Sequence, residues 1–257
     1  MAGDVQSGMD IIYGINPVTE ALKMESCRIL RIAVSRDAGN EPVQKIMVLA
    51  AEKNIPVAFQ EKRELEKLAG HRSHQGIVGL CKPFAYAELD RIIENRHQTP
   101  LRCLLLLLDG ITDPQNLGAL IRTAHCFGAD GVVVPGHRSA SVNATVVKAS
   151  AGAALYTPVA RIANMARALD DLKEKGFWVY GADAASGQDM NAASYHGDVG
   201  LVMGSEGEGL RSIIKKKCDF LLSIPMKGKI DSLNVSVAAG ILLHDIHRKW
   251  ASKKGAE

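Results

Sequence analysis

The stretch of sequence that decides the fold is residues 104–135, which read LLLLLDGITDPQNLGALIRTAHCFGADGVVVP. Its run of leucines stops at an Asp-Gly pair, which is typical of a short buried strand followed by a turn. Asp113 and Pro114 then mark the start of a helix, because aspartate is a favoured N-cap and proline suits the first helical position. The valines at 132–134 predict the next strand, so the stretch is predicted to be a βαβ unit in a parallel sheet that is covered on both faces.

Two polar residues of the predicted helix are not needed for its folding. Leu117, Leu120 and Ile121 give the helix one apolar face. Asn116 lies in the first turn, and Arg122 points away from the apolar face. On their own, an amide near the cap and a solvated arginine explain both positions. The stretch therefore predicts the fold class, an α/β protein, but not the function.

The composition is that of a soluble globular protein. At 257 residues the chain can form one large or two ordinary domains, and 47% of its residues are hydrophobic and 23% charged. No apolar run is long enough to cross a bilayer, and the N-terminus carries no secretory signal. Five scattered cysteines without a C-x-x-C spacing favour a reducing compartment and argue against a zinc site or a disulfide framework. We therefore expect a cytoplasmic protein that uses neither a metal nor a membrane.

The net charge of +3 is small, but the basic residues are clustered. Clusters lie at residues 215–217 after Arg211, at Lys227 and Lys229, and at residues 248–254. Such clusters suit a polyanionic partner such as RNA. Lysine runs near helix ends are also often simple solvated surface, so the charge alone leaves both interpretations open.

Two domains are predicted, separated by a polar break near residue 97. Residues 1–10 are expected to be disordered, 11–83 to form a small three-layer α/β domain, 84–100 to form a linker and 101–257 to form the second domain. In the first domain the pattern predicts strands at 29–35, 56–59 and 77–81 and helices at 42–53 and 61–69. In the rest of the chain it predicts strands at 104–108, 132–135, 177–181, 200–203 and 221–225 and helices at 86–96, 114–127, 144–153, 162–175, 211–217 and 233–249.

A polar loop, GHRSHQG at residues 70–76, lies in the first domain. Loops often carry binding residues, so Arg72 and His74 are candidates for contacts with RNA phosphates. A plain surface turn explains the same residues equally well.

The sequence GSEGEG at residues 204–209 follows a predicted strand and precedes a predicted helix. Glycine-rich loops in this position often bind phosphate. This loop lacks the Lys-Ser/Thr pair of a Walker loop and does not match the dinucleotide fingerprint, and its glutamates would repel phosphate. A neutral or cationic ligand suits it better.

The last patterned stretch is IPM, followed at residues 232–240 by SLNVSVAAG. Ser232 is a plausible N-cap, and Ser236 and Gly240 make a smooth stripe that allows a neighbouring backbone to approach closely. Tight helix packing explains that stripe without any chemistry. Asn234 is different, because a polar amide early in an otherwise apolar helix needs a hydrogen-bond partner.

Together these stretches resemble a known enzyme family. NLGALIR at 116–122, LVMGSEGEGL at 201–210, and IPM followed by SLNVSVAAG are similar, in order and spacing, to the three motifs of the SpoU (TrmH-type) RNA ribose 2′-O-methyltransferases of the SPOUT class. YGINPV at 13–18 and HQGI at 74–77 resemble the substrate-binding domain of the bacterial 23S rRNA guanosine 2′-O-methyltransferase branch, which has an L30e-like fold. Leu155 departs from the pattern, because relatives often carry an acidic residue there.

The resemblance implies a C-terminal SPOUT-type parallel sheet with a deep trefoil knot, which periodicity would not predict because knots are nearly absent from proteins. It also implies S-adenosylmethionine as the cofactor and no metal. This cofactor carries a sulfonium cation and no phosphate, which suits the glutamates of GSEGEG. The residues that the resemblance assigns to cofactor binding are Met203, Gly204, Gly207, Ile224, Pro225, Met226, Leu233, Asn234 and Val235.

The same resemblance assigns catalytic roles to Arg122, Asn116, Glu206, Ser232 and Asn234. A ribose hydroxyl is a poor nucleophile, so it must be deprotonated or its developing charge must be stabilised. Because an arginine side chain stays protonated, Arg122 is better suited to orienting the hydroxyl and stabilising the oxyanion than to acting as a base. We expect Asn116 and Glu206 to orient Arg122 or the ribose, and Ser232 and Asn234 to order the third motif and the cofactor edge.

We therefore expect an enzyme that methylates a ribose 2′-hydroxyl in RNA, and most specifically that of a guanosine in large-subunit 23S rRNA. The family acts as a homodimer, and the stripe on helix 233–249 is a candidate interface. A tRNA ribose methyltransferase and a non-catalytic RNA-binding protein that retains the fold are the alternatives. A nucleotide-binding α/β enzyme is disfavoured because GSEGEG lacks a lysine.

Overall fold

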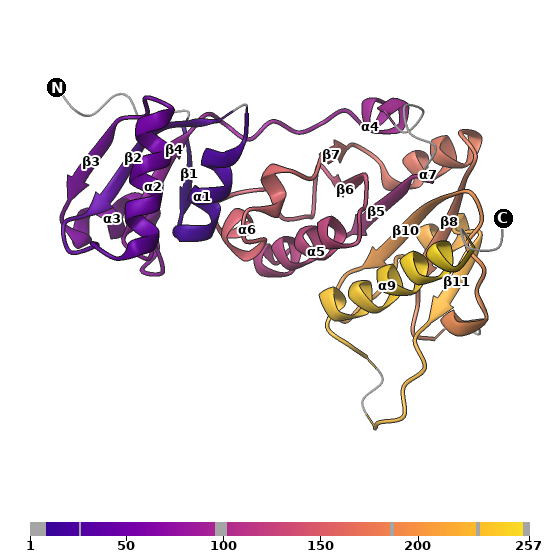
Figure 1. Ribbon diagram of the computed structural model, residues 1–257. Coiled ribbons are helices and arrows are strands. Elements are labelled where there is room, and N and C mark those ends of the chain that lie inside the picture. Colours follow the sequence, from indigo (N-terminus) through magenta and orange to yellow (C-terminus); the bar gives the residue numbers. More distant parts are fainter. Residues whose placement is uncertain (1–8, 26, 96–101, 186–187, 230–231, 254–257) are drawn as a thin grey trace. The chain divides into compact units, whose positions relative to one another are not determined.

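The computed structural model describes residues 9–25, 27–95, 102–185, 188–229 and 232–253. The chain divides into two compact units (Figure 1). Unit 1 consists of Met1–Ala85 with Ser141–Leu155, and unit 2 of Tyr86–Ala140 with Tyr156–Glu257. The sequence pattern assigned 141–155 to the second domain, because nothing in that segment indicates the distant residues against which it packs.

Unit 1 is built on a four-stranded sheet in the order β1-β4-β2-β3. Its strands are β1 (Asp10–Tyr13), β2 (Ile29–Ser35), β3 (Val57–Gln60) and β4 (Ile77–Cys81). β4 runs antiparallel to β1 and β2, whereas β2 and β3 are parallel. The predicted strands at 29–35 and 77–81 are confirmed. β1 was not predicted, because a four-residue strand gives too short a pattern, and it begins inside the segment expected to be disordered, of which residues 1–8 lie outside the described part.

The helices of unit 1 are α1 (Ile15–Lys23), α2 (Glu41–Glu52), α3 (Lys62–Ala69) and α6 (Ala144–Ala149). Local sequence sets their ends. The Asn40 side chain caps α2 by accepting a hydrogen bond from the Val43 N–H, and Gly70 ends α3 in the left-handed conformation. α6 is connected to the loop between α3 and β4 by Lys148, whose Nζ donates to the Gln75 side chain.

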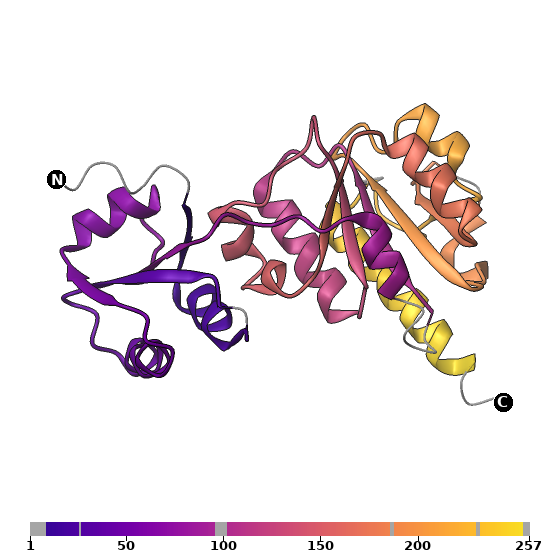
Figure 2. The same cartoon turned by 90° about the horizontal axis from the view of Figure 1, so that it is seen from above.

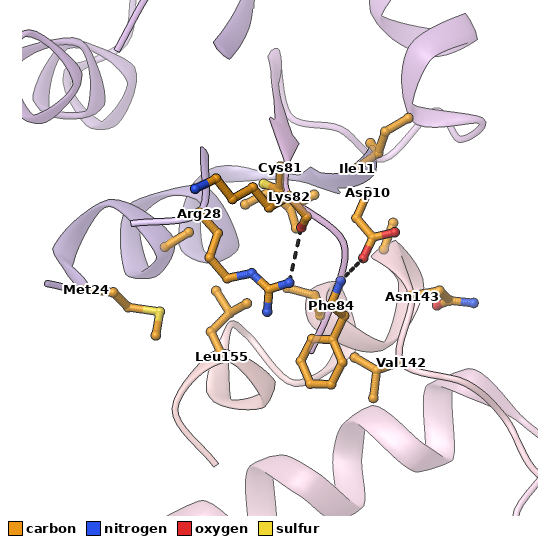
Figure 3. Close-up of a pocket in the computed structure, with 14 residues that line it drawn as sticks. Asp10, Ile11, Met24, Arg28, Cys81, Lys82, Phe84, Val142, Asn143 and Leu155 are labelled. Atoms are coloured by element: carbon orange, nitrogen blue, oxygen red, sulfur yellow. Dashed lines mark hydrogen bonds between the residues drawn. The ribbon is translucent and has the colours of Figure 1, made fainter. Parts of the chain in front are cut away.

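A small cavity of about 30 Å³, enough for roughly one water molecule, shows what the segment 141–155 contributes to unit 1 (Figure 3). The Phe84 N–H donates to the Asp10 carboxylate (2.5 Å), and the Arg28 guanidinium lies 5.5 Å from the centre of the Phe84 ring. Val142 and Leu155 complete the apolar wall. At the position where relatives often carry an acidic residue, this chain therefore places a leucine in an apolar contact.

Unit 2 is built on a seven-stranded sheet in the order β7-β6-β5-β10-β8-β11-β9, in which every described pairing is parallel. The strands are β5 (Leu104–Asp109), β6 (Gly131–Pro135), β7 (Val159–Ile162), β8 (Phe177–Ala182), β9 (Gln188–Asp189), β10 (Asp198–Gly204) and β11 (Phe220–Ser223). β5 lies near the centre, with every side chain buried. The predicted parallel α/β sheet is confirmed, whereas the trefoil knot stays a prediction.

Helices cover both faces of this sheet (Figure 2). One face is covered by α4 (Leu89–Asn95), α7 (Met165–Glu174) and α8 (Ser212–Lys217), which share a core with Leu105 and Leu107 of β5. The other face is covered by α5 (Pro114–Cys126) and α9 (Val235–Lys253), which pack against each other. Side chains alternate along a strand, so the remaining leucines of β5 face α5 and α9. The five-leucine run thus supplies apolar surface to both layers.

The βαβ prediction is confirmed by β5, α5 and β6, including the Asp113 cap, which accepts hydrogen bonds from the Gln115 and Asn116 N–H groups. Several predicted boundaries are wrong, including that of the helix predicted at 144–153, which ends at Ala149. The helix predicted at 162–175 begins at Met165, because the Asn164 side chain caps it, and the residues before it form β7. The strand predicted at 221–225 ends at Ser223, which leaves the IPM residues in a loop.

The described part of the chain contains no helix that combines the length and the apolar character needed to cross a bilayer.

His74 was a candidate for RNA contact, but only 1% of its surface is exposed, so that prediction is wrong. Its Nδ1 accepts a hydrogen bond from the Gly76 N–H, and among the described residues its Nε2 has no partner. Burial, followed by the effect of Lys62, lowers the pKa of His74 below its usual 6.5, against an opposing effect of Glu66.

We expect the stability of unit 1 to fall as His74 is protonated. The neutral form dominates above the unfolded-state pKa, and protonation below about pH 6.5 favours the unfolded chain, where the pKa is not lowered. Thermal unfolding followed by circular dichroism should show a lower midpoint at about pH 5.5 than at about pH 7.5. His74→Gln, which can still accept a hydrogen bond, should show a smaller drop, and an equal drop in both proteins would contradict this role.

Candidate active site

Three side chains from distant parts of the sequence meet where β5 and β10 end. Asn116 lies in the first turn of α5, Glu206 lies in the loop after β10, and Asn234 immediately precedes α9. Glu206 Oε1 accepts hydrogen bonds from Asn116 Nδ2 (2.6 Å) and from Asn234 Nδ2 (2.9 Å). Asn234 Nδ2 also donates to Asn116 Oδ1 (3.1 Å). This triad brings one residue of each of the three sequence motifs into direct contact.

Asn234 also caps α9. Its Oδ1 accepts from the Ser236 N–H (2.9 Å) and from the Ser236 hydroxyl (2.6 Å). The amide that the sequence left without an explanation therefore connects the start of α9 to Glu206. The prediction that Ser232 caps this helix is wrong, because the helix begins at Val235 and the capping side chain is that of Asn234.

The GSEGEG loop is held in a tight turn by its own backbone. Ser205 and Gly209 exchange two backbone hydrogen bonds, of 3.2 and 2.9 Å, and Gly207 and Gly209 have positive φ values of 84° and 66°. Gly204 lies so close to the returning chain that a Cβ atom there would be 2.1 Å from the carbonyl carbon of Gly209. The glycines thus allow two backbone segments to approach each other closely.

A cavity of about 420 Å³ opens beside this loop, within the size range of small-molecule sites. Of the residues predicted to bind a cofactor, those that line it are Met203, Gly204, Gly207, Ile224, Met226, Leu233 and Val235. Pro225 and Asn234 do not line it, whereas Glu206 and Ser232, which were predicted to be catalytic, do. Lining residues that the sequence did not indicate include Ala182, Asp183, Lys215, Leu222 and Leu242.

The polar groups of the cavity are mainly acidic. Glu206 and Glu208 line it together with Asp183, and Lys215 forms an ion pair with Asp183 (3.0 Å). Since the lysine is already paired with a carboxylate, this cavity is poorly suited to phosphate and well suited to a neutral or cationic ligand. Asp183 could have been noticed in the sequence, because it follows β8 at the edge where ligands bind in parallel sheets.

Arg122 lies apart from these contacts. Its side chain is exposed on α5, and no hydrogen bond or ion pair of Arg122 is found within the described ranges. Asn116 and Glu206, which were expected to orient Arg122 or a ribose, instead bond to each other and to Asn234. The guanidinium is therefore available to a ligand.

The basic clusters are less available than the sequence suggested. Lys215 pairs with Asp183, and Lys217 lies 2.6 Å from Asp170. Arg248 and Lys249 both pair with the buried carboxylate of Asp245, at 2.7 and 2.8 Å. These partners are distant in sequence or hidden in the same helix, so charge counting could not identify them. These four cations are thus paired with carboxylates rather than forming an open basic surface.

Comparison with known proteins identifies the family. The SpoU rRNA Methylase family matches residues 103–244, and a second family, RNA 2′-O ribose methyltransferase substrate binding, matches residues 11–87. The chain belongs to the SpoU family and is an RNA methyltransferase of that family.

Individual relatives agree with this assignment. The chain is 38% identical over 240 residues to the putative TrmH family tRNA/rRNA methyltransferase YacO of Bacillus subtilis, covering 93% of this chain and 96% of YacO. It is 25% identical to the AdoMet-bound rRNA methyltransferase of Sinorhizobium meliloti, with a TM-score of 0.75 over 94% of this chain and 87% of that one. The SpoU methyltransferase AviRb from Streptomyces viridochromogenes, at 23% identity, shares the fold, with a TM-score of 0.78 over 95% and 92% of the two chains.

Substituting Gly204 tests the tight turn of the loop. Gly204→Ala would place a methyl group against the Gly209 backbone, which cannot move aside as a flexible side chain can. We expect the free energy of unfolding to fall by about 1–3 kcal/mol, as for other overpacked sites. Gly39→Ala is the control, because a Cβ atom there meets nothing within 4 Å. Urea unfolding of both variants measures the difference, and equal stabilities would contradict the close approach.

Proposed function

We propose that this chain transfers a methyl group from S-adenosylmethionine to the 2′-hydroxyl of a ribose in RNA, and that its target is a guanosine of large-subunit 23S rRNA. The observation that carries the proposal is the convergence of Asn116, Glu206 and Asn234 beside a cavity with acidic polar groups. Five cysteines without a disulfide are in keeping with action in the cytoplasm.

The cavity fits this cofactor by its chemistry. S-adenosylmethionine supplies an electrophilic methyl group on a positively charged sulfur. Met203, Ile224, Met226 and Leu233 offer apolar contact for its uncharged parts, and the carboxylates beside them complement its positive charge. The SpoU methyltransferase AviRb and the rRNA methyltransferase of Sinorhizobium meliloti have been crystallised with AdoMet, which supports the same ligand here.

The chemistry requires that a ribose hydroxyl be oriented and its developing negative charge stabilised. Arg122, exposed on α5, can donate hydrogen bonds to that oxygen or to a neighbouring RNA phosphate. The triad carries one carboxylate and two amides, and we assign it the role of fixing the ribose. Ser232 lines the cavity and completes the polar edge that the third motif contributes.

RNA recognition is assigned to unit 1, whose residues match the substrate-binding family. Arg72 is exposed in the loop after α3, and it is the candidate phosphate contact there that remains after the burial of His74. The relatives carry names that include both tRNA and rRNA, so methylation of tRNA is the second candidate. A non-catalytic RNA-binding protein is the third, and the intact triad argues against it.

We also propose that the protein acts as a homodimer through α9. A groove of about 590 Å³ runs along α9 and is lined by Gly240 and Ile241 of that helix, by Phe127 just after α5, and by Met190. Val237 beside it is 50% exposed, which is unusual for a residue of its type in a helix that packs against the core. A second copy of this helix would cover that surface.

The central experiment is methyl transfer from labelled S-adenosylmethionine to unmodified large-subunit rRNA and to tRNA, with mapping of the product by alkali resistance. A 2′-O-methyl group blocks cleavage at the next phosphate, so the map identifies both the nucleotide and the chemistry. Label in rRNA alone supports the proposal, and label in tRNA alone supports the second candidate. Label in neither RNA, with the cofactor bound, would favour the non-catalytic alternative.

Arg122→Ala should lower kcat by a factor of about 100 or more, because the charge stabilising the reacting oxygen is lost. The Kd for S-adenosylmethionine, measured by calorimetry, should stay nearly unchanged, since Arg122 does not line the cavity. Arg167→Ala, which removes an exposed arginine on α7, should leave both values unchanged. Loss of cofactor binding in Arg122→Ala would refute the assigned role.

Arg72→Ala should raise the KM for RNA several-fold with little change in kcat, because a phosphate contact contributes affinity rather than chemistry. The effect should shrink as the salt concentration rises. Lys45→Ala, which removes a similarly exposed cation from α2, is the control. Steady-state kinetics at two salt concentrations measure the difference, and identical KM values for the two variants would place the RNA elsewhere.

A further inference from the structure

An ion pair between an exposed arginine and a buried carboxylate borders the GSEGEG loop. Asp109 is the last residue of β5, and its side chain is 1% exposed, whereas that of Arg211 is 53% exposed. Arg211 Nε lies 3.0 Å from both carboxylate oxygens of Asp109, and Nη2 lies 2.6 Å from Oδ1. A buried carboxylate needs such a partner. A bidentate contact fixes the orientation of the guanidinium as well as its distance from the carboxylate.

The pair closes the GSEGEG loop at both ends. The loop begins at Gly204, which is paired with Asp109 in the β10–β5 ladder. Two residues after its last glycine, Arg211 binds the side chain of the same Asp109. The hydrogen bonds between Ser205 and Gly209 close the turn between these two attachments. One residue of β5 therefore anchors both stems of the loop.

Asp109 is also connected, through the chain that follows it, to Asn116 of the triad. After Asp109 the chain passes through Gly110, at φ 82°, to the Asp113 cap and then to Asn116. Glu206 at the tip of the loop and Asn116 at the start of α5 are thus both placed from Asp109. The hydrogen bond between them is 2.6 Å long, and it depends on the positions of both supports.

We propose that Asp109 and Arg211 are positioning residues for methyl transfer: by holding the loop 204–211 at both ends, they keep Glu206 in contact with Asn116 and Asn234. The inference rests on the proposed function for its kinetic consequence, but not for its structural one. Neither residue lines the cofactor cavity, so the effect reaches the chemistry through Glu206.

The structure offers a matched control for the simpler explanation that this ion pair only stabilises the fold. Lys217 lies on α8, which begins directly after Arg211, and it pairs with Asp170 of α7 at 2.6 Å. Lys217→Gln removes an ion pair of α8 without changing a residue that contacts the loop. Arg211→Gln removes the ion pair with Asp109. Arg211→Lys keeps the positive charge but cannot form the bidentate contact.

The experiment compares these variants in the full chain. With saturating S-adenosylmethionine, Arg211→Gln should lower kcat at least tenfold while the KM for RNA changes less than threefold, and Arg211→Lys should recover part of kcat. Lys217→Gln should keep the wild-type kcat. Amide hydrogen exchange of residues 205–210 provides a readout that needs no activity, and it should quicken in Arg211→Gln but not in Lys217→Gln.

The outcomes separate the two proposals. If the wild-type chain methylates no RNA, the proposed function fails, while faster exchange confined to the loop of Arg211→Gln still supports the positioning role. The inference is overturned if Arg211→Gln keeps both the wild-type kcat and the wild-type exchange of the loop. It is also overturned if Lys217→Gln reproduces its effects, because the pair would then contribute only general stability.

Discussion

The burial of β5 on both faces is the constraint on which the rest of unit 2 depends. A strand made of leucines cannot present any side to water, so helices must cover both faces, and a strand so covered lies inside a parallel sheet. Parallel strands all end at one edge. β10 is the neighbour of β5, with Gly204 beside Asp109, and the loops after both strands therefore meet there. The place of the candidate active site follows from this packing.

Much of the fold could be predicted from periodicity and caps. The strand at 29–35 and the unit from β5 to β6 follow from apolar runs and from the Asp113 cap. β7 was missed because an exposed Arg161 interrupts its short apolar pattern and the following helix pattern overlaps it. Strand order was also beyond the sequence, since β10 inserts between β5 and β8 although other strands precede it in the chain.

The sequence indicated the residues of the candidate site but not the contacts between them. Resemblance selected Asn116, Glu206 and Asn234, yet no spacing rule indicates that they bond to one another. The sequence could not decide between RNA binding and a solvated surface for the lysine clusters, because the acidic partners of Lys215 and Lys217 lie on other elements. His74 misled the sequence analysis because a polar loop residue can still be buried by the fold around it. In each case the missing information is a distance between residues far apart in the chain.

The segment Ser141–Leu155 has a consequence for how such a protein can be divided or recombined. Unit 1 is discontinuous, since the chain leaves it after residue 85 and returns to it to build α6 and one wall of its small cavity. A fragment cut at a single point near residue 85 would expose the apolar surface that Val142 and Leu155 cover. Exchange of this unit between relatives, by engineering or by evolution, requires that two separate segments of the sequence be transferred together.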